Sequence, residues 1–177
     1  LLVVIYSFPY MSDKNKEHPD APRRRFYVYF STFIGAMAGL AYSSTIVGQL
    51  VFFEITGVCS WGLISYYMTP TAKKAGMKAL IITHIGALGL YIGAAFLFAG
   101  TGTFALSAIS QLDSGMKTVV LLLILFAAWA KSAQFPLYMW LPSAMEAPTP
   151  VSAYLHSSTM VKLGVFLLAR LTPVLGG

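Results

Sequence analysis

Four ionisable side chains stand inside long apolar stretches of this chain: Glu54, Lys131, His156 and Lys162. A charged group near the centre of a bilayer costs at least ~2.5–3.5 kcal/mol to insert, and such a residue is by default functional. Carboxylate, amine and imidazole groups can all accept and release a proton. Residues of these types at membrane depth therefore predict a path along which protons are loaded and released.

Glu54 and Lys131 have opposite charge and similar expected depth. With a helical rise of ~1.5 Å per residue, Glu54 lies about 12 Å and Lys131 about 18 Å from the same membrane surface. Burial favours the neutral form of a lysine, whereas a nearby carboxylate favours its charged form. We therefore expect Glu54 to control the protonation of Lys131. The alternative is a static ion pair, since polar groups can also hold membrane helices together.

His156 and Lys162 stand in the last apolar stretch, at about 21 Å and about 12 Å on the same depth scale. Histidine titrates nearest to neutral pH, so His156 is expected to relay protons. Lys162 lies roughly 120° from His156 around the helix, an arrangement that still allows both to border one hydrated channel. The remaining membrane histidine, His84, is expected to be a packed or interfacial residue rather than a haem ligand, because no motif accompanies it.

Two prolines, Pro136 and Pro142, follow Lys131 within the fourth apolar stretch. A proline inside a helix removes a backbone donor and clashes with the carbonyl four residues earlier. Freed carbonyls at membrane depth are tolerated only where protein or water satisfies them, and interrupted helices of this kind mark ion sites in transporters. We expect a helix break beside Lys131 that serves the ion path. A simple kink is the alternative.

The overall composition indicates a membrane protein. Of 177 residues, 57% are hydrophobic and only 10% are charged, and the mean hydropathy is +0.71. A soluble domain usually carries about 25% charged residues, so these charges are too few to cover a soluble surface. The lipid bilayer is therefore the expected environment.

Five apolar stretches each approach the ~20 residues that a membrane crossing requires. They cover residues 26–45, 46–67, 78–99, 119–141 and 150–171. We expect residues 1–11 to be the tail of a truncated transmembrane helix and residues 172–177 to be a truncated end. The ~10-residue alternating segments of barrel strands do not occur. The predicted fold class is an all-α membrane protein, a bundle of about five transmembrane helices plus a partial one.

Basic residues gather in two of the connecting segments. Residues 12–25 and 68–77 contain Lys14, Lys16, Arg23, Arg24, Arg25, Lys73 and Lys74. The opposite side contains only Lys117 and Arg170. Cytoplasmic loops carry an excess of lysine and arginine, so loops 12–25 and 68–77 are expected to be cytoplasmic.

Several other function classes are disfavoured. The net charge is +6, but the basic residues lie beside apolar runs, so no nucleic-acid partner is expected. The single cysteine, Cys59, excludes an internal disulfide framework. Because the sequence has no CxxC motif, no glycine-rich nucleotide loop and no haem-binding histidine pair, we expect neither a cofactor nor a metal in this chain.

Three stretches carry a family resemblance. KSAQFPLYMWLPSAMEAPTPVSAYLHSSTMVKLGVFLLARLTP, at 131–173, resembles the antiporter-like membrane subunits shared by respiratory complex I, membrane-bound hydrogenases and Mrp cation/proton antiporters. Within it, KSAQ matches the seventh family helix and LHSSTMVK the eighth. VFFEITGVCSWGLISYY, at 51–67, resembles the motif of the fifth helix. The details MEAPTPVSAYLHSSTMVK and TGTF look most like the large A subunit of Mrp-type Na+/H+ antiporters.

The resemblance implies roles for the residues singled out above. Glu54 would be the carboxylate that tunes Lys131, Lys131 the central proton carrier, and His156 and Lys162 the continuation of the path. The family core has about fourteen helices in two inverted five-helix units, a common transporter design. This chain would supply one half of that inverted-repeat fold, including the proline-broken seventh helix. Complex I relatives typically have arginine and aspartate near the places of His84 and Ala87, which favours the Mrp type.

The expected function is that of a proton-translocating subunit fragment of a multisubunit Na+/H+ antiporter in a prokaryotic cell membrane. It would be a transporter by itself, with other membrane subunits, protons and Na+ as partners. One alternative is a proton-pumping membrane subunit of complex I or a hydrogenase, whose redox cofactors would sit in other subunits. The other is a structural scaffold that has lost transport. Retention of four ionisable residues in the apolar stretches counts against the scaffold.

Overall fold

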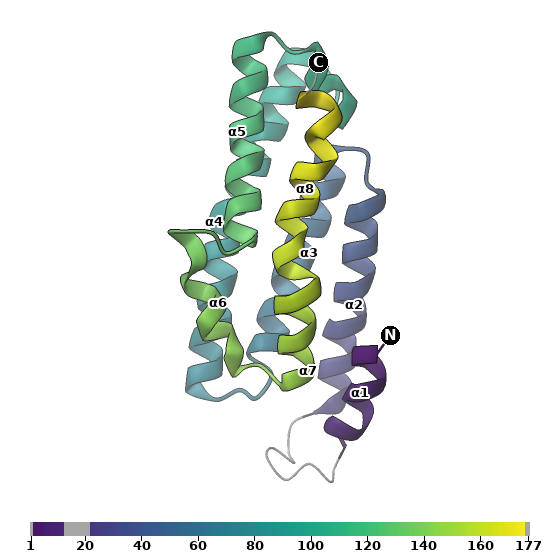
Figure 1. The fold of residues 1–177 in the computed structure, drawn as a ribbon, viewed down its shortest axis with the longest axis vertical. Helices are drawn as coiled ribbons and strands as arrows, with labels where there is room; N and C mark the ends of the chain where they lie inside the picture. Colours follow the sequence, from purple (N-terminus) through teal and green to yellow (C-terminus); the bar gives the residue numbers. More distant parts are fainter. Residues whose placement is uncertain (1, 13–21, 176–177) are drawn as a thin grey trace.

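Long helices run side by side along one axis of the molecule (Figure 1). The computed structural model describes residues 2–12 and 22–175. Its longer elements are α1 (Leu2–Tyr10), α2 (Arg23–Tyr42), α3 (Ile46–Ile64), α4 (Pro70–Thr101), α5 (Ser114–Lys131) and α8 (Met160–Leu175). Shorter elements are η1 (Leu106–Gln111), η2 (Leu137–Met139), α6 (Trp140–Ser143), η3 (Ala144–Glu146), α7 (Thr149–Ser152) and the π-helical η4 (Ala153–Ser158). No strand occurs among the described residues, so the predicted all-α class is confirmed.

Four helical stretches are long and apolar enough to cross a membrane. They are α3, α4, α5 and the run Thr149–Pro173, which joins α7, η4 and most of α8. Helix α2 has 20 residues but is not among them. Its three arginines and its tyrosine, serine and glycine residues lower its mean hydropathy. The membrane character expected from composition is confirmed, while a crossing by α2 stays a prediction.

Two helix boundaries differ from the expected ones because of capping. Helix α4 begins at Pro70, so most of segment 68–77, expected to be a loop, is helical. The Thr69 hydroxyl accepts a hydrogen bond from Ala72 N at 3.1 Å and caps this start. Helix α5 begins at Ser114 because Asp113 Oδ2 accepts a hydrogen bond from Gly115 N at 3.1 Å. The expected loop 12–25 lies largely outside the described residues.

The helix ends near Thr45 are tied together by the backbone and by one arginine. Ile46 N donates to Phe104 O at 2.9 Å, which fastens the α4–α5 connection to the α2–α3 turn. The Arg170 guanidinium on α8 donates to Ala41 O and to Ser43 O, both at 3.1 Å. Carbonyls at the end of a helix have no helical partner, so Arg170 caps the C-terminus of α2.

Two apolar clusters fill the interior. One is centred on Phe53, Leu90 and Ile124 and joins α3, α4, α5 and α8. The other is centred on Phe26, Trp140 and the residues around η4. The fully buried Lys131 belongs to neither cluster, although its ammonium lies against the Phe53 ring of the first.

Candidate proton-transfer site

Helix α5 ends at Lys131, and the chain then leaves the helix axis before η2 and α6 (Figure 1). Gln134 N donates to Trp129 O at 3.1 Å, and Ala133 N donates to Ala130 O at 3.3 Å. These are the two hydrogen bonds of a Schellman motif. Ala133 has φ of 51°, in the left-handed region where glycine is usual. The helix is therefore interrupted directly at Lys131 and not merely kinked.

Side chains satisfy carbonyls at this interruption. The buried Trp140 indole donates to Ala130 O at 3.1 Å. Gln134 Nε2 donates to Ser132 O at 3.3 Å, and this is the carbonyl that Pro136 was expected to free. Ser132 Oγ in turn donates to Val161 O of α8 at 2.8 Å. Protein donors thus allow a broken helix at this depth. Pro142 causes no comparable break, because it lies inside α6.

The side chain of Lys131 is completely buried. Its ammonium donates to Phe53 O on α3 at 3.3 Å and lies 4.3 Å from the centre of the Phe53 ring. The same carbonyl accepts the Thr56 hydroxyl at 2.7 Å. A carbonyl and an aromatic face both stabilise an ammonium without fixing it in an ion pair. Lys131 is thus held inside the bundle by groups that carry no formal charge.

Glu54 does not form an ion pair with Lys131, which was the alternative interpretation of these two residues from the sequence. Its Oε2 lies 2.7 Å from Nε2 of His84 on α4, whereas no contact within 4.0 Å joins it to Lys131. The side chains of His84 and Glu54 are 43% and 18% exposed, and they line an open groove together with Tyr91. Glu54 directly follows Phe53, whose carbonyl accepts from Lys131. The structure therefore does not contain the static pair between Glu54 and Lys131.

His84 is the functional candidate that the sequence reasoning missed. It was expected to be a packed or interfacial residue without a role in the site, and its half-exposed ring contacts the carboxylate of Glu54. An ionisable residue within an apolar stretch was the signal used to select the other four residues. The same signal applies to His84, which was not selected only because no local sequence motif accompanies it.

His156 lies in the π-helical turn η4, separated from Lys131 by Trp140. Its ring centre is 6.4 Å from that of Trp140, at an interplanar angle of 61°. Both ring nitrogens are buried and have no hydrogen-bond partner among the described residues. Single π-helical turns inside α-helices occur often at functional sites. Trp140 thus contacts both regions. Its indole N–H donates to Ala130 O, next to the interruption at Lys131, and its ring packs against the ring of His156.

Lys162 does not lie near the other ionisable residues of the site. It lies on an exposed face of α8, and its side chain makes no hydrogen bond or ion pair with the described part of the chain. The structure therefore gathers Glu54, His84 and Lys131 around one turn of α3, with His156 behind Trp140. The role of Lys162 as a continuation of the path stays a prediction.

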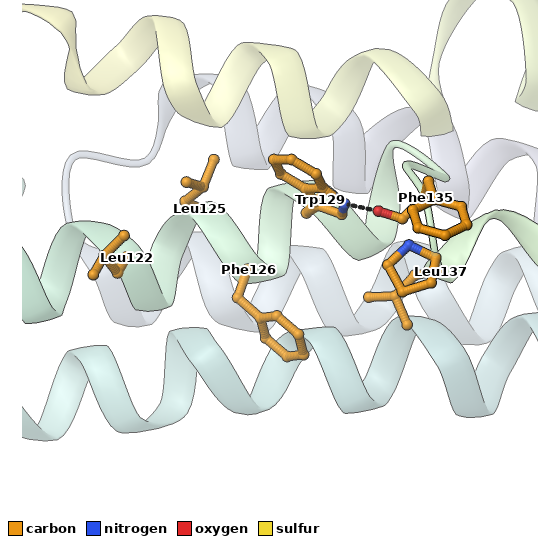
Figure 2. Close-up of a pocket in the computed structure, with 7 residues that line it drawn as sticks. Leu122, Leu125, Phe126, Trp129, Phe135 and Leu137 are labelled. Carbon is orange, nitrogen blue, oxygen red and sulfur yellow. Dashed lines mark hydrogen bonds between the residues drawn. The ribbon is translucent and has the colours of Figure 1, made fainter.

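An apolar groove lies on the other side of the interruption (Figure 2). Its lining residues are Leu122, Leu125, Phe126, Trp129, Phe135, Pro136 and Leu137. Trp129 and Lys131 are two positions apart, about 200° around the helix, so they point in nearly opposite directions. The Trp129 indole donates to Phe135 O at 2.6 Å, the bond drawn in Figure 2. This groove contains no ionisable side chain, so we place the chemistry on the Lys131 side.

Comparison with known proteins decides the family. A family model described as "NADH:quinone oxidoreductase/Mrp antiporter, TM" matches residues 43–176. The chain belongs to this family. It is 43% identical over 182 residues to the A subunit of the Na(+)/H(+) antiporter of Alkalihalophilus pseudofirmus, covering 99% of the chain and 22% of the relative. It is 42% identical over 185 residues to chloroplast NAD(P)H-quinone oxidoreductase subunit 5 of Nephroselmis olivacea, covering 98% of the chain and 28% of the relative.

Two solved structures have a similar fold. The Mrp complex from Dietzia sp. matches with a TM-score of 0.77 and 39% identity, over 82% of this chain and 17% of that one. An archaeal membrane-bound sulfane sulfur reductase matches with a TM-score of 0.83 and 27% identity, over 98% of this chain and 37% of that one. These matches confirm the resemblance to the antiporter-like family that the motifs indicated. The chain spans about a quarter of the length of the curated relatives.

Proposed function

We propose that this chain is the proton-translocating part of a subunit in a multisubunit Na+/H+ antiporter, with Lys131 as the central proton carrier. The observation that carries the proposal is the position of Lys131, completely buried at the end of an interrupted helix, with no carboxylate of the described residues at ion-pair distance. A lysine that served as structural glue would need a fixed counter-ion to offset its burial. A lysine that takes up and releases a proton needs both of its charge states to be tolerated.

The surroundings of Lys131 support both states. The Phe53 carbonyl and ring stabilise the ammonium, while the apolar walls from α3 and α5 suit the neutral amine. Glu54 acts on Lys131 from one residue beyond Phe53. A change in the charge of Glu54 therefore changes the preference of Lys131 for its protonated form. His156, beyond Trp140, is the acceptor that we assign to the next step.

The same proposal extends to partners and location. The protein would work with other membrane subunits in a prokaryotic cell membrane, exchanging protons against Na+. The basic residues at the start of α4 and beside Arg23 support a cytoplasmic position for loops 12–25 and 68–77. Lys78 Nζ at this end donates to Ser143 Oγ at 3.3 Å, so one of these basic residues also joins α4 to α6.

A redox-driven proton pump is the second candidate function. The observation in its favour is the 42% identity to a subunit of an NAD(P)H-quinone oxidoreductase. The proton path through Lys131 would be the same in both cases, and only the driving reaction would differ. Purification of the whole protein with its native partners separates the two, because redox-enzyme partners carry iron–sulfur or nickel–iron centres and antiporter partners do not.

The test of the carrier role is Lys131→Ala in the full-length protein, assembled with its partner subunits and reconstituted into vesicles. We expect cation-dependent proton flux to be abolished while the complex stays assembled. Lys74→Ala is the control, because Lys74 is an exposed lysine at the start of α4. Wild-type flux in Lys131→Ala would overturn the proposal.

A further inference from the structure

The contact between His84 and Glu54 contains a proton. His84 Nδ1 lies 3.0 Å from Leu80 O, and a carbonyl oxygen can only accept, so Nδ1 carries a hydrogen. His84 Nε2 lies 2.7 Å from Glu54 Oε2. Two bare lone-pair atoms do not approach so closely, whereas a charge-assisted hydrogen bond has this length. The pair thus holds one shared proton in addition to the Nδ1 hydrogen, and its net charge is zero.

Gly57 separates this pair from Lys131. A Cβ atom at Gly57 would stand 3.5 Å from His84 Cε1, 3.7 Å from Lys131 Nζ and 3.8 Å from His84 Nδ1. The imidazole of α4 and the amine of α5 therefore both come close to the same point of α3. Because glycine has no side chain, the space above its Cα is not filled by residue 57 itself. The ring nitrogen of His84 nearest to this space is Nδ1, whose hydrogen is donated to Leu80 O.

We propose that His84 exchanges a proton with Lys131 across Gly57. His84 releases the Nδ1 proton from its hydrogen bond with Leu80 O, and the proton passes by way of water beside Gly57 to the neutral amine of Lys131. The shared proton then stays on Nε2 and continues to bond Glu54. The pair changes from zero charge to −1 and Lys131 from zero to +1, so the total charge is conserved. Acid–base groups exchange protons directly or through water in this way.

This relay rests on the proposed function, since it assigns the partner that loads and unloads Lys131. The other titratable groups that face it are Tyr91, which interacts with Glu54 from α4, and Cys59, which acts on Lys131 from α3. Both are neutral at neutral pH in their ordinary state. Neither is among the nearest neighbours of the space above Gly57, whereas His84 is, so His84 is the group placed to exchange a proton with the amine.

The first test is Gly57→Ala in the whole protein within its assembled complex. The added methyl meets its neighbours at ordinary van der Waals distances, so the bundle tolerates it, but it occupies the point that lies close to both the imidazole and the amine. We expect proton flux in vesicles to fall about tenfold or more, as for a small displacement of reacting groups. Gly35→Ala is the matched control, because nothing lies within 4 Å of its added Cβ. Wild-type flux in Gly57→Ala would overturn the relay.

The second test is His84→Gln, which retains a side-chain donor for Glu54 but has no titratable proton. We expect flux to fall on the order of 100-fold with assembly retained. Wild-type flux in His84→Gln would contradict the relay. If Lys131→Ala abolishes flux while both His84→Gln and Gly57→Ala transport normally, the carrier role stands and the relay fails. Unchanged flux in Lys131→Ala removes the proposed function itself.

Discussion

Glu54 Oε2 on α3 lies 2.7 Å from His84 Nε2 on α4, so the carboxylate of the site is paired with an imidazole and not with the buried lysine. Lys131 instead donates to the carbonyl of Phe53, the residue before Glu54. One turn of α3 therefore connects a half-exposed acid–base pair with a completely buried amine. This arrangement allows the charge of the pair to influence Lys131 without a permanent ion pair that would hold its proton in place.

Glu54→Gln removes the carboxylate but leaves an acceptor for the His84 ring. We expect transport to slow by about 100-fold, at the lower end of what an acid–base group contributes. The Lys131 ammonium loses the negative charge that favours it, so the alkaline edge of the transport profile should move to lower pH. Flux measured in vesicles across a pH series checks both effects. An unchanged profile would mean that Glu54 only joins α3 to α4.

Trp140→Phe separates the hydrogen bond of the indole from its packing. The ring against His156 is retained, but Ala130 O loses its side-chain donor and keeps only the bond from Ala133 N. One hydrogen bond contributes about 0.5–1.5 kcal/mol net, so the free energy of unfolding should fall by that amount. Denaturant unfolding in detergent provides the measurement. Trp61→Phe is the control, because the Trp61 indole makes no hydrogen bond among the described residues; an equal loss there would reject the capping role.

Gly164→Ala tests how closely α5 and α8 approach. A Cβ at this position would overlap the Ala128 carbonyl oxygen and the Ser132 hydroxyl. Because the obstacle includes backbone, the helices must separate, at a cost of about 1–3 kcal/mol. We expect a lower unfolding temperature and less assembled complex on size-exclusion chromatography. Gly35→Ala, which meets no neighbouring atom and removes a glycine from a helix interior, should lower neither the unfolding temperature nor the amount of assembled complex.

Ala133→Gly should stabilise the protein. Ala133 has φ of 51° at the end of α5, a conformation that costs a residue with a Cβ about 1 kcal/mol and costs glycine almost nothing. The free energy of unfolding should therefore rise by about 1 kcal/mol. The same change at Ala38, in the middle of α2, should lower it by about 1 kcal/mol instead. Stabilisation by both changes would contradict the conformational explanation.

Much of the fold followed from patterns within single segments. Long apolar runs and the lack of alternation specify membrane helices locally, through burial and backbone hydrogen bonding. The exact helix ends did not follow so directly. The fourth stretch reads as helical to residue 141, yet α5 ends at Lys131, because bonds from Ala133 and Gln134 close the helix before Pro136 is reached.

The sequence by itself determined that Glu54, Lys131 and His156 would lie within long apolar helical stretches, because helix-forming apolar runs surround each of them. Only the tertiary structure decided their partners. His84 reaches Glu54 because α4 packs along α3, and Lys131 and His84 both come close to Gly57 where those helices meet α5. Partner choice depends on how helices are rotated about their axes. That rotation is set by packing between segments far apart in the chain, which a pattern within one segment does not contain.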